Sequence, residues 1–292
     1  MKLFPNDTCL LRREDAPLAL RALLAPIIFY APFLASLPPK YAAPLLLLVF
    51  YLLLDTNYIL HLHVHRPLTR SRALNLALDL CLGATTGMTA SNWRIQHVYG
   101  HHLGRDAPFR GGGVRMQDAY SVGRALKYSL LSIWPTFHGP LVEAFDKGLL
   151  RGEIDPIDYR WAFCEQCLLL LLVAALLYVS PPLTLFYVVP SFAAAYFGSR
   201  YIDYLNHYGC DESDPHPFAR SNNCLDVRFN RRLHNFGYHA AHHFRPGAHW
   251  TELPRIHAEI AGRIPARCLK NVSWSFLSVP RHFYLAAKGS MP

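Results

Sequence analysis

The chain has 292 residues, of which 52% are hydrophobic and 17% are charged, and its mean hydropathy is +0.11. Ordinary soluble proteins carry about 25% charged residues, and disordered chains combine low hydrophobicity with high net charge. The composition therefore excludes disorder and is unusual for a soluble enzyme. The net charge is +9, but most basic residues stand between apolar blocks, as in cytoplasmic loops of membrane proteins. We expect a membrane protein with no nucleic-acid partner.

Four apolar blocks are long enough to cross a bilayer, which takes about 20 mostly apolar residues. They cover residues 17–37, 41–60, 163–180 and 183–202. Proline-containing breaks near 37–40 and 180–182 turn each pair of blocks into a hairpin. The sequence therefore predicts an all-α integral membrane bundle with about four transmembrane helices.

The remaining segments are less apolar. Residues 73–90 contain Asp79 and end in a Gly- and Thr-rich stretch, so they predict a re-entrant, interfacial or buried segment. Residues 126–145 indicate an amphipathic interfacial stretch broken at Pro135 and Pro140. The polar and basic residues 206–292 predict a cytoplasmic helical cap that carries a di-metal site. We expect residues 1–292 to form a single membrane domain.

Histidine is the residue type that stands out, with 16 in the chain. An isolated histidine is usually a hydrogen-bonded core or surface residue. Here His61 and His65 share a helix face at the end of the second block, because residues four apart lie one above the other. Asp203 stands one turn before His207, at the exit of the fourth block. The clustered histidines are His61, His65, His97, His101, His102, His207, His239, His242 and His243.

This pattern indicates metal binding, because neutral imidazole is the commonest protein ligand for metals and one helical turn brings two rings to one ion. Nine imidazoles are too many for one ion, which takes about four in a zinc site. They fit two ions, and imidazole-rich open sites suit iron. The clusters are separated by an even number of predicted crossings, so all nine histidines can reach the same membrane face.

Three segments carry a family resemblance: HLHVH at 61–65, HVYGHH at 97–102 and HAAHH at 239–243. They resemble the three histidine boxes of integral-membrane fatty acid desaturases and alkane hydroxylases. The resemblance covers residues 41–257. Residues 96–102 and the NHYG run at 206–209 are more similar to alkane monooxygenases, whereas residues 235–246 are more similar to desaturases.

The resemblance implies two iron ions (Fe2+/Fe3+) that use O2 to abstract hydrogen from an unactivated C–H bond of a fatty-acyl or alkyl chain. The implied ligands are the nine clustered histidines. Asp203 is either a direct or water-bridged ligand or a hydrogen-bond partner of a ligand. No further catalytic residue is implied. Desaturation is slightly favoured, while hydroxylation, olefin-forming decarboxylation and acetylene formation stay open.

Electrons must come from outside, since the pair Cys164 and Cys167 offers only two of the four thiolates of an iron–sulfur site. We expect a ferredoxin, rubredoxin or cytochrome partner, with docking arginines at Arg228, Arg231, Arg232 and Arg245. The lipid-type substrate would enter between the helices. Small residues such as Gly83, Gly87 and Gly198 either line that path or allow close helix packing. We expect a bacterial inner-membrane protein whose active site faces the cytoplasm.

Two acidic residues lie within or close to the apolar segments. Asp55 and Asp79 are costly inside spans, so they either serve as hydrogen-bond partners of box histidines or lie near the membrane interface.

Two other classes of protein are alternatives to this enzyme. A His-rich metal transporter would place its ligands near the bilayer midplane, whereas these histidines lie at span ends or outside. A hydrolytic membrane zinc enzyme would turn over without O2.

Overall fold

The computed structural model describes residues 12–102, 114, 117–211 and 213–270. Residues 271–292 of the predicted cap therefore lie outside the described residues. The chain divides into two compact units. Unit 1 comprises Met1–Asp106 and Ile133–Ser199, and unit 2 comprises Ala107–Ser132 and Arg200–Pro292. That both units act as one domain stays a prediction. The described elements are almost all helical, as the sequence predicts.

Unit 1 contains the long apolar helices. They are α1 (Ala16–Leu34), α2 (Ala42–His65) and α7 (Pro156–Val179). Among the described residues, the segments long and apolar enough to cross a membrane are Arg13–Leu34, Pro39–His65 and Asp158–Val179. The first two are joined through the short 3-10 turn η2 (Pro39–Tyr41), where the sequence predicts a hairpin break. Three of the four predicted spans thus appear as helices of spanning length.

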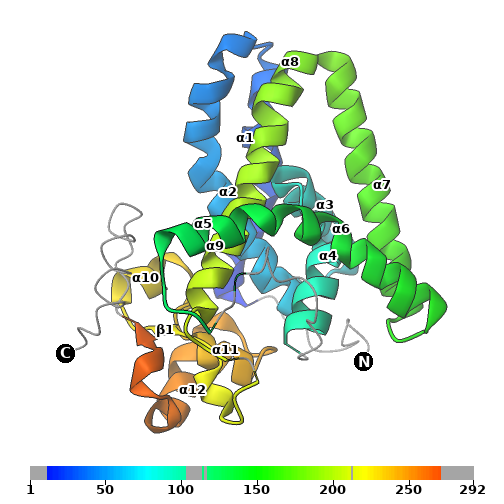
Figure 1. Cartoon of the computed structure of the whole chain (residues 1–292). Helices are drawn as coiled ribbons and strands as arrows, with labels where there is room; N and C mark the ends of the chain where they lie inside the picture. The colour runs from blue at the N-terminus through cyan, green and yellow to red at the C-terminus, as the bar shows by residue number, and fades with distance from the viewer. Residues whose placement is uncertain (1–11, 103–113, 115–116, 212, 271–292) are drawn as a thin grey trace. The chain divides into compact units, whose positions relative to one another are not determined.

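The fourth predicted span, 183–202, is interrupted. It comprises α8 (Pro181–Leu183), the π-helical turn η6 (Thr184–Val188) and α9 (Val189–His207). Figure 1 shows α7 and α9 as two arms joined at α8. The second half of α9 holds Arg200 and Asp203, which explains why α9 is not among the helices apolar enough to span. The total number of crossings stays a prediction.

Residues 73–90, whose role the sequence leaves open, form α3 (Arg72–Thr86) and the start of α4 (Ala90–Trp93). Ser71 caps α3 by accepting a hydrogen bond from the backbone N–H of Leu74, and Gly87 ends it in the left-handed conformation with φ 70°, which glycine adopts without strain. Helix α3 packs against α1, α2 and α7. Its position relative to a membrane surface stays a prediction.

The rest of unit 1 consists of short helices: η1 (Arg13–Asp15), η3 (Arg94–His101), α6 (Ile133–Glu143) and η5 (Ala144–Leu150). The predicted breaks at Pro135 and Pro140 are wrong, because both prolines lie within α6. The interruption falls instead at Ser132, between α6 and α5 (Val122–Leu131). A proline in the first turn of a helix costs little, since the N–H that it lacks has no intrahelical partner there.

Unit 2 contains α5, the end of α9 and a set of short elements. These are η7 (Pro217–Ala219), β1 (Asn223–Cys224), α10 (Val227–Arg232), α11 (His239–Phe244), η8 (Trp250–Glu252), α12 (Leu253–Ile260), η9 (Ala261–Arg263), η10 (Ala266–Cys268) and β2 (Leu269–Lys270). Strands β1 and β2 pair in parallel. A core of Phe218, Leu253, Ile256 and Ile260 packs α11 and α12 together.

Candidate metal centre

The first histidine cluster lies in unit 1, where α2 ends beside η3. The rings of His61 and His65 are 4.9 Å apart between centroids, as their one-turn spacing predicts, and the His97 ring is 4.6 Å from His61 and 4.9 Å from His65. One ring nitrogen from each of these three residues lies within 4.8 Å of the others. His61 and His97 are buried, so three imidazoles converge in a protected place.

The second box adopts a wider turn than the α-helix that its one-turn spacing suggests. Residues Arg94–His101 form a π-helix, and the N–H of His102 donates to the carbonyl of His97, five residues earlier, at 3.1 Å. This winding places Nε2 of His102 at 3.2 Å from Nε2 of His97. The ring of His101 lies 5.3 Å from that of His97. Wide turns of this kind are frequent at functional sites.

Burial controls the protonation of His97. Removal from water, and then the neighbouring rings of His61, His102 and His65, hold the pKa of His97 well below its usual 6.5. A low pKa keeps the ring neutral, with a lone pair available, and the neutral ring is the form that binds metals.

His63 lies on α2 between two box histidines but turns to a different partner. Its Nδ1 accepts a hydrogen bond from the backbone N–H of Leu68 at 3.2 Å. Its proton is therefore on Nε2, which lies 3.1 Å from Oδ1 of Asp79 on α3. The same Asp79 oxygen lies 3.7 Å from the Arg94 guanidinium of η3. Asp79 thus links the helices that carry the first and second boxes.

The second histidine cluster lies in unit 2. Nε2 of His239 is 3.2 Å from Nε2 of His207 and 3.1 Å from Nε2 of His243. Each nitrogen holds either a proton or a lone pair, so one His239 nitrogen cannot serve as donor to one neighbour and acceptor from the other. A shared metal ion would accept all three lone pairs. Two imidazole nitrogens bound at about 2.1 Å and at right angles lie about 3 Å apart, which matches this spacing.

Backbone contacts prepare His207 for that role. Its Nδ1 lies 3.0 Å from the carbonyl oxygen of Arg220, and a carbonyl accepts only, so Nδ1 carries the proton. Nε2 is therefore the nitrogen with the lone pair. Such a contact on the far nitrogen fixes the tautomer and ring orientation of metal-binding histidines.

The turn before α11 presents the third box. Gly237 donates from its N–H to Oδ1 of Asn230 at 2.9 Å, and its carbonyl accepts from the N–H of Cys224 at 2.8 Å. Oδ1 of Asn223 accepts from the N–H of Ala240 in the first turn of α11 at 2.9 Å. The sequence pattern does not identify Asn223 and Asn230 as site residues, because their role depends on a turn between distant residues.

Several predicted residues have other described contacts. His242 lies 5.6 Å from His239, ring to ring. Asp203 accepts from the Tyr128 hydroxyl at 2.6 Å and lies 3.5 Å from Arg200, so its role as a ligand stays a prediction. Asp55 pairs with Arg21 at 2.9 Å, a contact between α2 and α1 that the sequence does not predict.

The geometry defines a helical membrane protein with two groups of converging, largely buried imidazoles. The chain matches the family described as fatty acid desaturase over residues 12–273, and it belongs to that family. No curated protein and no solved structure matches it. The chain is therefore a lipid-modifying oxidoreductase of the desaturase/hydroxylase type, an enzyme of a membrane environment that acts on a lipid or acyl substrate. The family is iron-dependent, and the histidine clusters fit a metal.

Proposed function

We propose that the protein is an O2-dependent di-iron oxidoreductase that activates an unactivated C–H bond of a fatty-acyl or alkyl chain, and that it is a desaturase. The observation that carries the proposal is the presence of three converging imidazoles in each unit. Family membership supports the substrate class. The proposed metal ligands are the nine clustered histidines, with Asp203 as a ligand or a partner of one.

The number of ligands supports two ions. Three imidazoles within one unit are one short of the smallest common coordination number, which is four. His101, His102 and His242 are the remaining donors, so the nine imidazoles supply four or five per ion and leave room for oxygen.

Bound iron would supply the activation of O2 and the removal of hydrogen from carbon. The chain's own residues hold and shield that chemistry. Arg220 keeps the His207 proton on Nδ1, burial keeps His97 neutral, and the burial of His61, His97, His207 and His239 limits the access of water to both clusters.

Desaturation and hydroxylation use the same inputs and differ in the product. Each consumes one O2 and two external electrons. A desaturase removes two hydrogens and releases two waters, whereas a hydroxylase leaves one oxygen atom in the product. We propose four spans, an active site facing the cytoplasm of a bacterial cell, and a ferredoxin, rubredoxin or cytochrome donor. Arg228, Arg231 and Arg232 on α10 are exposed and offer a basic docking surface for an acidic donor.

The test measures iron content and reaction products of the purified protein in lipid nanodiscs, and metal flux in proteoliposomes. We expect about two irons per chain and, with a deuterated acyl chain, 18O2 and a chemically reduced ferredoxin as the electron source, a product that has lost two deuterium atoms and gained no 18O. His243→Ala should lose both iron and product, and the exposed His216→Ala should keep both. An 18O-labelled alcohol would favour the hydroxylase alternative. Less than one iron per chain in active protein, or metal flux without oxygen use, would contradict the proposal.

A further inference from the structure

A buried carboxylate inside the α7 span takes no part in either histidine cluster. Glu165 stands between Cys164 and Cys167 and is only 2% exposed. Its Oε2 accepts a hydrogen bond from the backbone N–H of Ser91 at 2.8 Å. Its Oε1 has no hydrogen-bond partner among the described residues. An ionisable group in a span is expensive, and such groups usually mark a functional site.

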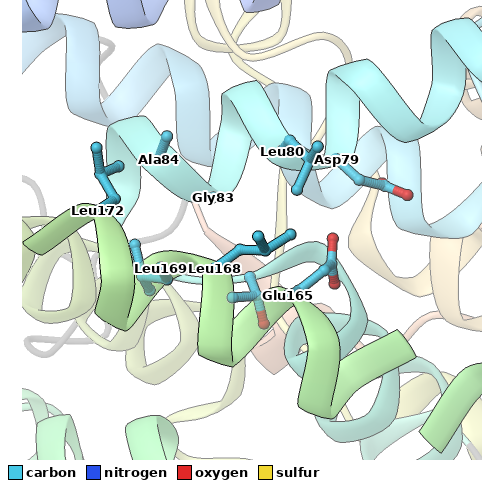
Figure 2. Close-up of a pocket in the computed structure, with 9 residues that line it drawn as sticks. Asp79, Leu80, Gly83, Ala84, Glu165, Leu168, Leu169 and Leu172 are labelled. Atoms are coloured by element: carbon cyan, nitrogen blue, oxygen red, sulfur yellow. The ribbon is translucent and has the colours of Figure 1, made fainter. Parts of the chain in front are cut away.

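Glu165 lies at one end of a pocket of about 200 Å³ between α3 and α7. Figure 2 shows Glu165 directed from α7 toward α3, with Asp79 at the same end of the pocket and with Leu172 and Ala84 toward the other end. The pocket is an apolar slot with an acidic end.

Two carboxylates, those of Glu165 and Asp79, line that end of the pocket. Arg94, 3.7 Å from Asp79, is the cation that the described contacts place beside them. Neither oxygen of Asp79 nor Oε1 of Glu165 has a hydrogen-bond partner among the described residues. A ligand group that donates hydrogen bonds, and above all a cationic one, satisfies both the charge and the Oε1 atom.

The pocket is reached from the side of the span. Leu168 of α7 and Leu80 of α3, which line it, are 42% and 39% exposed. Gly83 also lines the pocket. By contrast, a Cβ at Gly87 or Gly198 would clash with Phe192 or Leu54, so these two glycines serve close packing. An amphiphile dissolved in lipid has a direct path into the slot.

We propose that this pocket binds an alkyl chain with a primary amine head, the head at Glu165 and Asp79 and the chain along the leucines. An alcohol head also donates a hydrogen bond but carries no positive charge, so it binds more weakly. A carboxylate head is excluded by repulsion. None of the nine proposed metal ligands lines the pocket, so this is a site in addition to the proposed centre.

The test measures binding of octylamine, 1-octanol and octanoate to the full-length, metal-free protein in detergent. We expect octylamine to bind most tightly, 1-octanol more weakly, and octanoate not above background. Glu165→Gln keeps an acceptor for Ser91 but removes the charge, and should weaken octylamine binding about tenfold, the loss of one charge-assisted contact. Ala84→Phe fills the slot and should abolish binding of all three, whereas Leu171→Phe, on the exposed face of α7, should leave it unchanged.

A crosslinking measurement covers the case in which a variant does not fold. A diazirine-bearing alkylamine should label peptides of α3 and α7 around Leu80 and Leu169 in the unaltered protein, and excess octylamine should prevent the labelling. Equal binding of octanoate and octylamine, unchanged binding in Ala84→Phe, or labelling elsewhere would overturn the proposal. Because the protein is metal-free, failure of the oxygen chemistry leaves this result unaffected.

Discussion

Gly237 shows how one residue type can be required without any side-chain chemistry. A Cβ at this position would lie 2.2 Å from the carbonyl oxygen of Cys224 and 2.6 Å from Oδ1 of Asn230. The first contact involves backbone, which cannot move aside cheaply. The close approach brings β1 against the turn that leads into α11, and therefore fixes where His239 begins its helix.

We predict that Gly237→Ala destabilises unit 2 by about 1–3 kcal/mol, the usual cost of forcing an extra methyl group into a packed site. It should also lower the iron content. Thermal unfolding and metal analysis check both effects. Gly262→Ala is the matched control, because a Cβ there meets nothing within 4 Å. Equal iron content in both variants would show that the turn does not position the third box.

A second prediction at this scale concerns acid. Burial lowers the pKa of His257 below its usual 6.5. The unfolded chain then binds a proton more readily than the folded one, so the stabilising contribution is complete above pH 6.5 and is lost as the pH falls below it. His257→Gln should therefore lose less thermal stability than the parent between pH 7.5 and 5.5. If both proteins lost the same amount of thermal stability between pH 7.5 and 5.5, the prediction would be wrong.

At the scale of elements, Asp79 holds three helices in register. It belongs to α3, and its Oδ1 lies 3.1 Å from Nε2 of His63 on α2 and 3.7 Å from the Arg94 guanidinium of η3. His63 stands between His61 and His65, and Arg94 stands three residues before His97. A shift of α3 would therefore move two boxes relative to each other.

We predict that Asp79→Leu destabilises the protein by about 3–5 kcal/mol, the usual cost of removing one partner of a buried ion pair, because it removes the carboxylate that lies 3.7 Å from the buried Arg94 guanidinium. Asp79→Asn keeps an acceptor for His63 and should cost less. Chemical unfolding of both variants, together with their iron content, measures the difference. If the two variants were equally stable, the side-chain oxygen at position 79 would contribute nothing to stability beyond the charge that both variants remove.

At the scale of the whole molecule, the proposed four crossings make a topological prediction. One added cysteine at Lys40 or Ser180 should react with an impermeant thiol reagent on one side of the membrane. One at Arg70 or Ser213 should react only on the other side. Labelling is read against the parent protein, which has its own thiols. If Ser213→Cys were labelled from the same side of the membrane as Lys40→Cys, α9 would not cross the membrane.

Much of the fold is predictable from the sequence, because long apolar runs and proline breaks are local signals. The apolar runs at 17–37, 41–60 and 163–180 appear as helices, and the turn between the first two falls where predicted. The proximity of His61 to His65 and of His239 to His243 is also predictable, because each pair is one helical turn apart. The link from Asp79 to His63 and the burial of Glu165 are not, since both depend on which helices become neighbours.

The wide turn at Arg94–His101 has a consequence for how sequence variation in this region should be read. A regular α-helix rotates successive side chains by about 100°, so at that pitch His102, five residues after His97, would point about 140° away from it. The five-residue spacing therefore requires the wide turn if the two rings are to meet. Removal of one codon between them would leave the histidines four residues apart, so a relative that lacks one residue here would align its rings in an ordinary α-helix.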